Sequence, residues 1–318
     1  MTEAQALEHT ELAYELQLEG RHRDALPLLA LAASHFAEAD GPLSPDLANL
    51  LLDQADSLLA LCRYAEAEEA ARHATRIVRE VKDQLDPEAR ASLAPRASAL
   101  HGRSLRELGH YDQAAPHLLH AISEAETLLG PDDPDLADYL SGYGVLCKHA
   151  GRFDEGERVY LRALSLLERE HGHQSPQTAT LYHNLGGLEH SRGDFAKGEP
   201  LARTAYEIHR KAFGEDDERT LADAVAWCGL LDGLERFHES IPIYQRALAV
   251  YETRLGHDHF EVAATLNNLG MALAAKGEPA AGVAMLERSL AIKKKLFGTS
   301  HPEVRLTEAN LNHARQSQ

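Results

Sequence analysis

A glycine recurs every 42 residues in the second part of the chain, at Gly130, Gly172, Gly214, Gly256 and Gly298. A second series of short turns begins at Gly20, Cys62, Gly109, Gly151, Gly193, Glu235 and Gly277, at intervals of 42, 47, 42, 42, 42 and 42 residues. The one longer interval coincides with the segment 83–95. A fixed period of this length is typical of repeat proteins, in which each unit packs only against its neighbours. The period therefore predicts seven stacked units.

Each unit is predicted to be an antiparallel pair of helices. Counted from the first turn residue, the seventh position before it and the twelfth position after it hold a small residue in every unit. Small side chains at matched positions allow two helix backbones to approach closely. Pro45, Pro134, Pro176 and Pro302 are expected to open first helices, because a proline at the first helical position loses no hydrogen bond. The glycines of the 42-residue series are expected to end second helices.

These patterns predict an all-α fold, a solenoid of seven antiparallel helix pairs in one continuous domain over residues 1–318. The units are expected near residues 3–41, 45–83, 88–130, 134–172, 176–214, 218–256 and 260–298. A lone polar helix over residues 301–316 is expected to cap the stack, because the last unit of an open-ended repeat array otherwise exposes its apolar face.

The overall charge excludes several classes of function. The chain has 32 Lys and Arg against 50 Asp and Glu, a net charge of −18. Nucleic acids and anionic membranes attract basic surfaces, so neither is an expected partner. No apolar run approaches the roughly 18 residues of a membrane-spanning helix, and the acidic first twenty residues are unlike a signal peptide. Cys62, Cys147 and Cys228 are too far apart for a disulfide framework or a zinc ribbon. A soluble protein of the reducing cytoplasm is predicted.

Whole segments of the sequence resemble the tetratricopeptide repeat in the 42-residue form found in kinesin light chains. They include HFEVAATLNNLGMALAAKG, which starts at His259, and SPQTATLYHNLGGLEHSRGDF, which starts at Ser175. The resemblance covers nearly the full chain and is clearest from Asp133 to Arg305. It implies a right-handed superhelix whose first helices line a concave face, and a non-enzymatic protein that binds other proteins or peptides without a cofactor.

Motifs for catalysis or metal binding are missing. The sequence contains no GxSxG elbow and no phosphate-binding GxxxxGK[ST] loop. Gly142 and Gly144 lie within a predicted helix, so they are interpreted as close-packing residues. The nineteen histidines include no HExxH pair and no Cys/His cluster. His259 and His301 precede helices and are interpreted as structural. A metal site or an enzymatic activity in the histidine-rich centre stays open as a distant alternative.

Basic and amide side chains gather on the face that the resemblance assigns to the groove. The candidate groove residues are Arg96, Arg103, Arg106, Lys148, His149, His183, Asn184, His190, Asn267 and Asn268. Asn184 and Asn268 match the asparagine of the family's L-x-N-L-G stretch, which the resemblance associates with holding a peptide backbone. The first two units carry acidic residues instead, at Glu11, Asp53 and Asp56.

The basic residues of this face predict a partner with acidic residues. An apolar side chain of that partner is expected to pack against Val145 or Leu185. The acidic rim is expected to repel the acidic residues of such a ligand and so to fix its direction along the groove. The competing interpretation is a solvated face with internal salt bridges such as Arg103 with Glu107. The leading hypothesis for function is a peptide-binding scaffold, and the alternative is a regulatory or sensor subunit that binds a peptide signal and switches an effector.

Overall fold

The computed structural model describes residues 1–299 and 301–316, and that part of the chain is all-helical, with 15 helices and no strand. The predicted fold class is thereby confirmed. The chain divides into two compact units, Met1–Leu166 and Leu167–Gln318, and each is described by itself. None of the described helices is long and apolar enough to cross a membrane.

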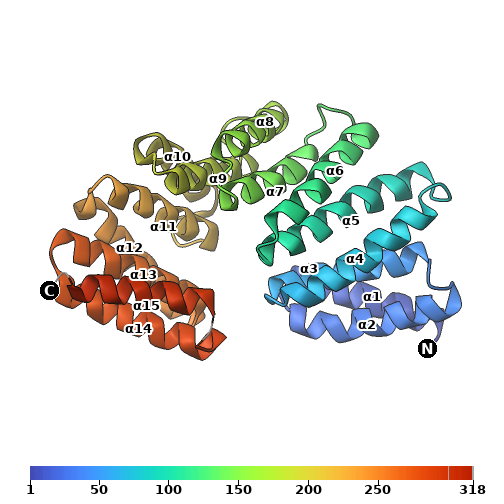
Figure 1. Cartoon of the computed structure of the whole chain (residues 1–318), viewed down its shortest axis with the longest axis horizontal. Helices are drawn as coiled ribbons and strands as arrows, with labels where there is room; N and C mark the ends of the chain where they lie inside the picture. The colour runs from blue at the N-terminus through green and yellow to red at the C-terminus, as the bar shows by residue number, and fades with distance from the viewer. Residues whose placement is uncertain (300, 317–318) are drawn as a thin grey trace. The chain divides into compact units, whose positions relative to one another are not determined.

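The first unit is a series of antiparallel helix pairs (Figure 1). Its helices are α1 (Glu3–Leu18), α2 (His22–Ala39), α3 (Pro45–Ala60), α4 (Tyr64–Val81), α5 (Pro87–Glu107), α6 (Tyr111–Leu129), α7 (Leu136–His149) and the greater part of α8 (Phe153–His171). The five extra residues of the long interval extend α5, which has 21 residues where α3 has 16. Asp86 caps this longer helix, because its Oδ1 accepts a hydrogen bond of 2.8 Å from the Ala89 amide.

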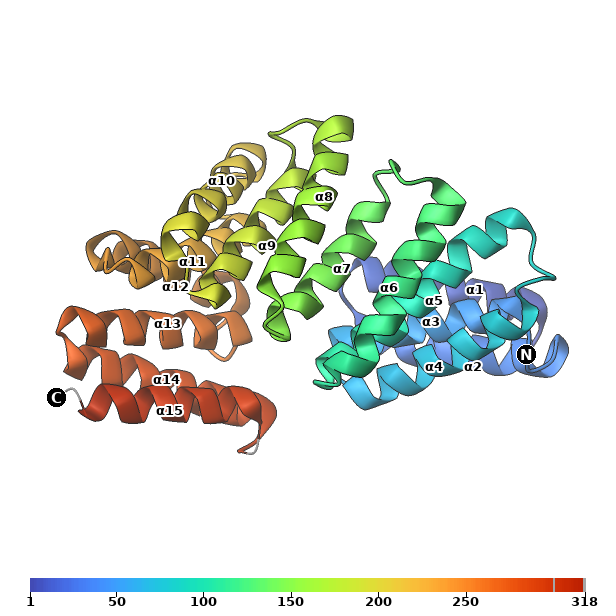
Figure 2. The same ribbon diagram turned by 45° about the horizontal axis from the view of Figure 1, so that its top comes forward.

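The second unit continues the same pattern (Figure 2). Its helices are α9 (Pro176–Arg192), α10 (Phe195–Phe213), α11 (Glu218–Gly233), α12 (Phe237–Leu255), α13 (Phe260–Lys276), α14 (Pro279–Phe297) and α15 (Pro302–Gln316). In both units the odd-numbered helices also contact the next odd-numbered helix, as α3 does α5 and α9 does α11. The odd-numbered helices therefore form the more closely packed row of each unit.

The helix boundaries follow the predicted signals with one exception. Ser44 and Ser175 each accept a hydrogen bond from the third residue of the helix that their following proline opens. His259 caps α13, because its Nδ1 accepts a hydrogen bond of 3.2 Å from the amide of Glu261, the second residue of that helix, so its predicted structural role is confirmed. Pro134 does not open α7, which begins at Leu136, because Asp133 accepts the Asp135 amide in a turn that delays the helix.

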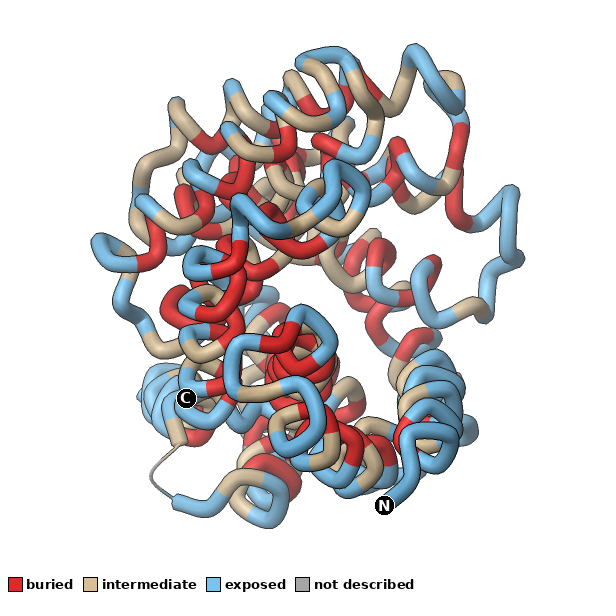
Figure 3. Tube along the Cα trace, turned by 90° about the vertical axis from the view of Figure 1, so that its right-hand side faces the viewer, coloured by how far each residue is buried: buried red, intermediate tan, exposed pale blue. Residues whose placement is uncertain are grey.

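The buried residues lie where neighbouring helices face one another (Figure 3). Every position predicted to hold a small residue at a helix crossing is buried. The tightest such crossing joins α7 to α8, where a Cβ atom on Gly144 would lie 2.5 Å from Cε1 of Tyr160. Gly142 has no neighbour within 4 Å of its own Cβ position, so its interpretation as a close-packing residue is wrong.

Helix α15 covers the end of the second unit, as the sequence predicts. Leu311 and Ala314 pack with Leu286 of α14 in one apolar cluster. Lys293 of α14 is only 2% exposed and its Nζ donates a 2.6 Å hydrogen bond to Glu303. A buried cation without this carboxylate would be costly, so the pair stabilises the docking of α15.

Candidate peptide-binding cleft

A cleft of about 690 Å³ lies in the first unit between α3, α5, α6 and α7. Three of the predicted groove residues line it from one face of α5, namely Arg96, Arg103 and Arg106. Val145 of α7, predicted as an apolar contact for a ligand, lines it as well. The cleft lies on the side of the odd-numbered helices, the face on which the sequence predicts binding.

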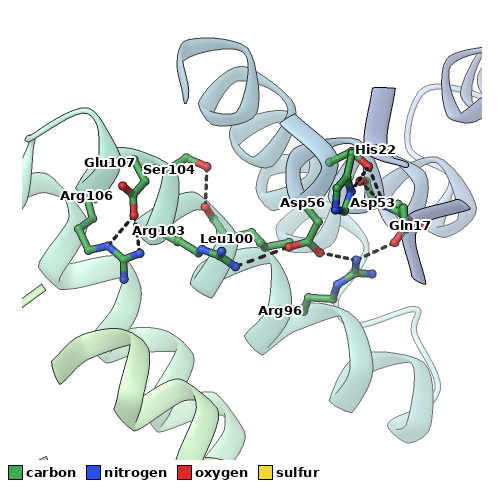
Figure 4. Close-up of polar contacts among 11 residues, drawn as sticks. Gln17, His22, Asp53, Asp56, Arg96, Leu100, Arg103, Ser104, Arg106 and Glu107 are labelled. Carbon is green, nitrogen blue, oxygen red and sulfur yellow. Dashed lines mark hydrogen bonds and ion pairs between the residues drawn. The ribbon is translucent and has the colours of Figure 1, made fainter. Parts of the chain in front are cut away.

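Arg96 is half-buried, and its guanidinium is held by side chains of α3. Its Nη1 donates to Asn49 Oδ1 at 2.9 Å. Its Nη2 donates to Asp53 Oδ1 at 2.6 Å and to Asp56 Oδ2 at 3.0 Å (Figure 4). Burial raises the pKa of Asp53 even though Arg96 acts to lower it. The predicted basic centre and the predicted acidic rim are therefore hydrogen-bonded to each other at this point. Two carboxylates of the protein itself neutralise much of the charge of Arg96.

The same network continues to α1. Gln17 donates through Nε2 to the Asp53 carbonyl oxygen at 2.9 Å and to Ser57 Oγ at 2.8 Å. Three successive odd-numbered helices, α1, α3 and α5, are thus linked by side-chain hydrogen bonds along one wall. A wall linked in this way keeps its side chains in fixed positions before any ligand binds.

Arg103 and Arg106 differ in how far they are available to a ligand. The Arg103 side chain is 51% exposed, and its Nη1 lies 3.9 Å from Asp56 Oδ1. The Arg106 side chain is only 9% exposed, and its Nη2 donates to Glu107 Oε1 at 2.5 Å. The suggested salt bridge of Arg103 with Glu107 is not formed, because Glu107 is paired with Arg106 instead. Arg106 also donates to the Gly142 carbonyl oxygen at 3.2 Å, which links α5 to α7.

Lys148 and His149 lie at the end of α7. Burial, followed by the nearby Arg106, lowers the pKa of Lys148, which makes no ion pair with any residue that the structure describes. Burial and Lys148 lower the pKa of His149, whose ring stacks on Tyr111 at 6.3 Å between centroids. Lys148 therefore adds positive potential near Arg106 on the α7 side, whereas the lowered pKa of His149 favours its neutral ring.

The opposite part of the cleft is acidic, which the sequence analysis largely missed. Asp135, which precedes α7, and Asp138 and Tyr139 of α7 line it together with Gly142 and Val145. Loss of hydration and the neighbouring Asp135 raise the pKa of Asp138. A signal for this row was available, because positions 135, 138, 139, 142 and 145 share one face of a helix.

The remaining predicted groove residues belong to the second unit. His183 donates through Nδ1 to Asp223 Oδ1 at 2.8 Å, and His209 donates through Nδ1 to Asp223 Oδ2 at 2.6 Å. Burial acts to raise the pKa of Asp223, but the hydrogen bonds from both histidines outweigh it and the pKa is lowered. His183 is therefore partly committed to an internal network.

The predicted asparagines and His190 are also tied to neighbouring elements. Asn267 is buried, donates to Asn268 Oδ1 at 3.1 Å and accepts from Asn310 of α15 at 3.0 Å. His190 is exposed, with its ring against Phe195 at 5.6 Å, and Asn184 is half-buried on the same helix. Over residues 1–299 and 301–316, no three His, Cys, Asp or Glu side chains are arranged to hold a metal ion.

The sequence matches models of one known protein family. A family model described as tetratricopeptide repeat matches residues 140–211 and 229–295, and a second model of the same description matches residues 102–135. Together they cover more than half of the chain. No curated protein sequence matches.

Several solved structures have a similar fold. BtubC (BKLC) from P. vanneervenii is 21% identical, with a TM-score of 0.60 over 75% of this chain and 94% of that one. Kinesin light chain repeats from Podospora anserina are 16% identical, with a TM-score of 0.53 over 64% and 96%. A Rap protein complexed with Competence and Sporulation Factor is 12% identical, with a TM-score of 0.63 over 98% and 87%. At these identities the likeness is one of fold alone.

Proposed function

The chain belongs to the tetratricopeptide repeat family, and we propose that it is a non-enzymatic scaffold that binds a peptide or partner segment in the cleft between α5 and α7. The observation that carries the proposal is the cleft itself, which combines exposed cationic and anionic side chains with the apolar Val145. A peptide chain offers the same combination of charged and apolar groups. Small-molecule sites are more enclosed and mainly apolar.

Arg103 is the proposed anchor for an acidic side chain of the ligand. Of the three arginines that line the cleft it has the most exposed side chain, at 51%, and the longest distance to an internal carboxylate. Its planar guanidinium can bind a carboxylate through two parallel hydrogen bonds. Lys148 does not line the cleft but adds a second cation near Arg106, whereas Asp135 and Asp138 line the cleft and disfavour acidic residues at the other end. The ligand is therefore acidic at one end only, which fixes its direction.

Selection from a displayed library of random nine-residue peptides tests this proposal. Wild-type protein is expected to enrich sequences with one Asp or Glu close to an apolar residue. Arg103→Glu is expected to abolish that enrichment, because it places like charges together. Arg21→Glu is a matched control, since the Arg21 side chain is 56% exposed and lies outside the cleft. Equal enrichment of the same sequences by both variants would refute the proposed anchor.

A second candidate function is a regulatory or sensor subunit that changes conformation when a peptide signal binds. It is favoured by the similarity of fold to the Rap protein that was solved with a bound factor, which extends over 98% of this chain. Small-angle scattering with and without a selected peptide separates the two, because a passive scaffold keeps its radius of gyration and a switch changes it. All three cysteines are free thiols, which supports action in the reducing cytoplasm in either case.

A further inference from the structure

A second crevice, of about 590 Å³, lies in the first unit between α4, α5 and α6. It borders the extension of α5 that the five inserted residues create, so it lies at the one place where the 42-residue period is broken. Helices α4, α5 and α6 follow one another in the stack, and α5 packs against both of the others (Figure 1). No residue is shared between this crevice and the candidate peptide-binding cleft.

Three cations in this crevice have no internal counter-charge. Arg79 of α4, Lys82 directly after α4 and Arg90 of α5 are exposed and line it. None of the three makes a hydrogen bond or ion pair through its side chain with any residue of the described chain. Each arginine of the peptide-binding cleft, by contrast, has a carboxylate within 4 Å. Cations that line the same crevice without a paired carboxylate repel one another, so a bound anion would stabilise this arrangement.

The other walls of the crevice supply neutral donors and one acid. His117 and His120 come from α6, and burial together with His120 lowers the pKa of His117, which keeps its ring neutral near pH 7. Glu124 is the acidic lining residue, and it is already engaged by the Ser98 hydroxyl at 3.2 Å and by His120 at 3.4 Å. The crevice therefore keeps an excess of positive charge in a protein whose net charge is −18.

We infer that this crevice is a binding site for a phosphoryl group, carried by a small phosphate monoester or present as free phosphate. A phosphate dianion has the charge and the number of acceptor oxygens to contact Arg79, Lys82 and Arg90 together, whereas a single carboxylate would leave most of the positive charge unmatched. Val78 and Leu128 form an apolar part of the lining that the organic portion of an ester can cover. The site is independent of the proposed peptide-binding function.

Isothermal titration calorimetry of the full chain with phenyl phosphate, inorganic phosphate and benzoate tests the inference. Phenyl phosphate is expected to bind one site per chain, and benzoate is expected to bind at least about tenfold more weakly. Arg79→Gln and Arg90→Gln are each expected to weaken phenyl phosphate about tenfold, the usual effect of losing a charge-assisted hydrogen bond. Arg76→Gln is the matched control, because Arg76 is an equally exposed and unpaired arginine of α4 that does not line the crevice.

The outcomes separate the sources of the phosphoryl group. Tighter binding of phenyl phosphate than of inorganic phosphate supports an ester ligand, and equal binding supports free phosphate. The inference is overturned if neither phosphate binds saturably, if benzoate binds as well as phenyl phosphate, or if Arg76→Gln weakens binding as much as Arg79→Gln. Since these side chains are exposed, the variants are expected to keep the wild-type circular dichroism spectrum. They are also expected to select the same peptides as wild type.

Discussion

Two glycines of α7, two residues apart, should respond in opposite ways to the same substitution. A Cβ atom on Gly142 would meet no atom within 4 Å, whereas one on Gly144 would lie 2.5 Å from Cε1 and 2.6 Å from Cζ of Tyr160. Tyr160 is fully buried, so its ring has little room to move away. Gly142→Ala and Gly144→Ala therefore differ in packing while sharing the same change in helix propensity.

The magnitudes follow from those two effects. Alanine is favoured over glycine in a helix by about 1 kcal/mol, so Gly142→Ala is expected to stabilise the helix by about that amount. At Gly144 the same gain is opposed by overpacking, which typically costs 1–3 kcal/mol. Because the overlap is severe and the ring is rigid, we expect a cost of about 3 kcal/mol and a net loss of about 2 kcal/mol at Gly144.

Amide hydrogen exchange in α7 and α8 measures these changes locally, which suits a repeat protein whose parts can open separately. Gly142→Ala is expected to slow exchange about fivefold, and Gly144→Ala to accelerate it about 30-fold, since 1.4 kcal/mol corresponds to a factor of ten. Adding Tyr160→Leu to Gly144→Ala should recover part of the loss, because the ring that overlaps the new methyl group is removed. If both glycine variants exchange alike, close packing at Gly144 is not what selects the small residue.

Three further predictions concern the second unit and the thiols. Leu311→Ala is expected to destabilise α13–α15 by about 2–5 kcal/mol, and faster hydrogen exchange confined to these helices would verify the cap, whereas unchanged exchange would contradict it. His209 contacts Asp223 Oδ2 at 2.6 Å and the Pro176 carbonyl oxygen at 3.1 Å, and its pKa is raised, first by the hydrogen bond to Asp223. Its stabilising contribution is therefore complete below the unfolded pKa of about 6.5 and lost as pH rises through the folded pKa, and urea unfolding at pH 6 to 9 should show this loss in wild type but not in His209→Gln. All three cysteines should titrate as free thiols after denaturation, with a melting temperature that does not depend on reductant.

Most of the fold could be predicted because the repeat signals are local. A glycine at the end of a second helix adopts a positive φ, as at Gly214 with 92° and Gly256 with 84°, and few other residues tolerate that conformation. Serine before proline at Ser175 combines a side-chain cap with a favoured first helical residue. Where a second local signal competes, as at Asp133 before Pro134, the prediction fails, because the aspartate stabilises a turn in place of the first helical turn.

The candidate site was less predictable, since it depends on which side chains meet between units. Asp53 and Asp56 were predicted to form a rim separate from Arg96, yet the three side chains form one network. Their separations along the chain are 43 and 40 residues, close to one repeat. His183 and Asp223 are likewise 40 residues apart, and Asn267 and Asn310 are 43 apart.

These separations have a common cause. Successive odd-numbered helices within a unit pack side by side and in parallel, so a residue lies beside the residue about one repeat further along the chain. In such a stack the charge available to a ligand at one repeat is the charge left after pairing with the repeats on either side.

By that measure Arg96 contributes little, because two carboxylates of the preceding repeat surround it. Most of the charge of Arg103 remains available to a ligand, because its Nη1 lies 3.9 Å from Asp56 Oδ1. The anchor of the proposed peptide site is therefore set by the absence of a close partner one repeat away, which a row of basic residues read within a single unit does not reveal.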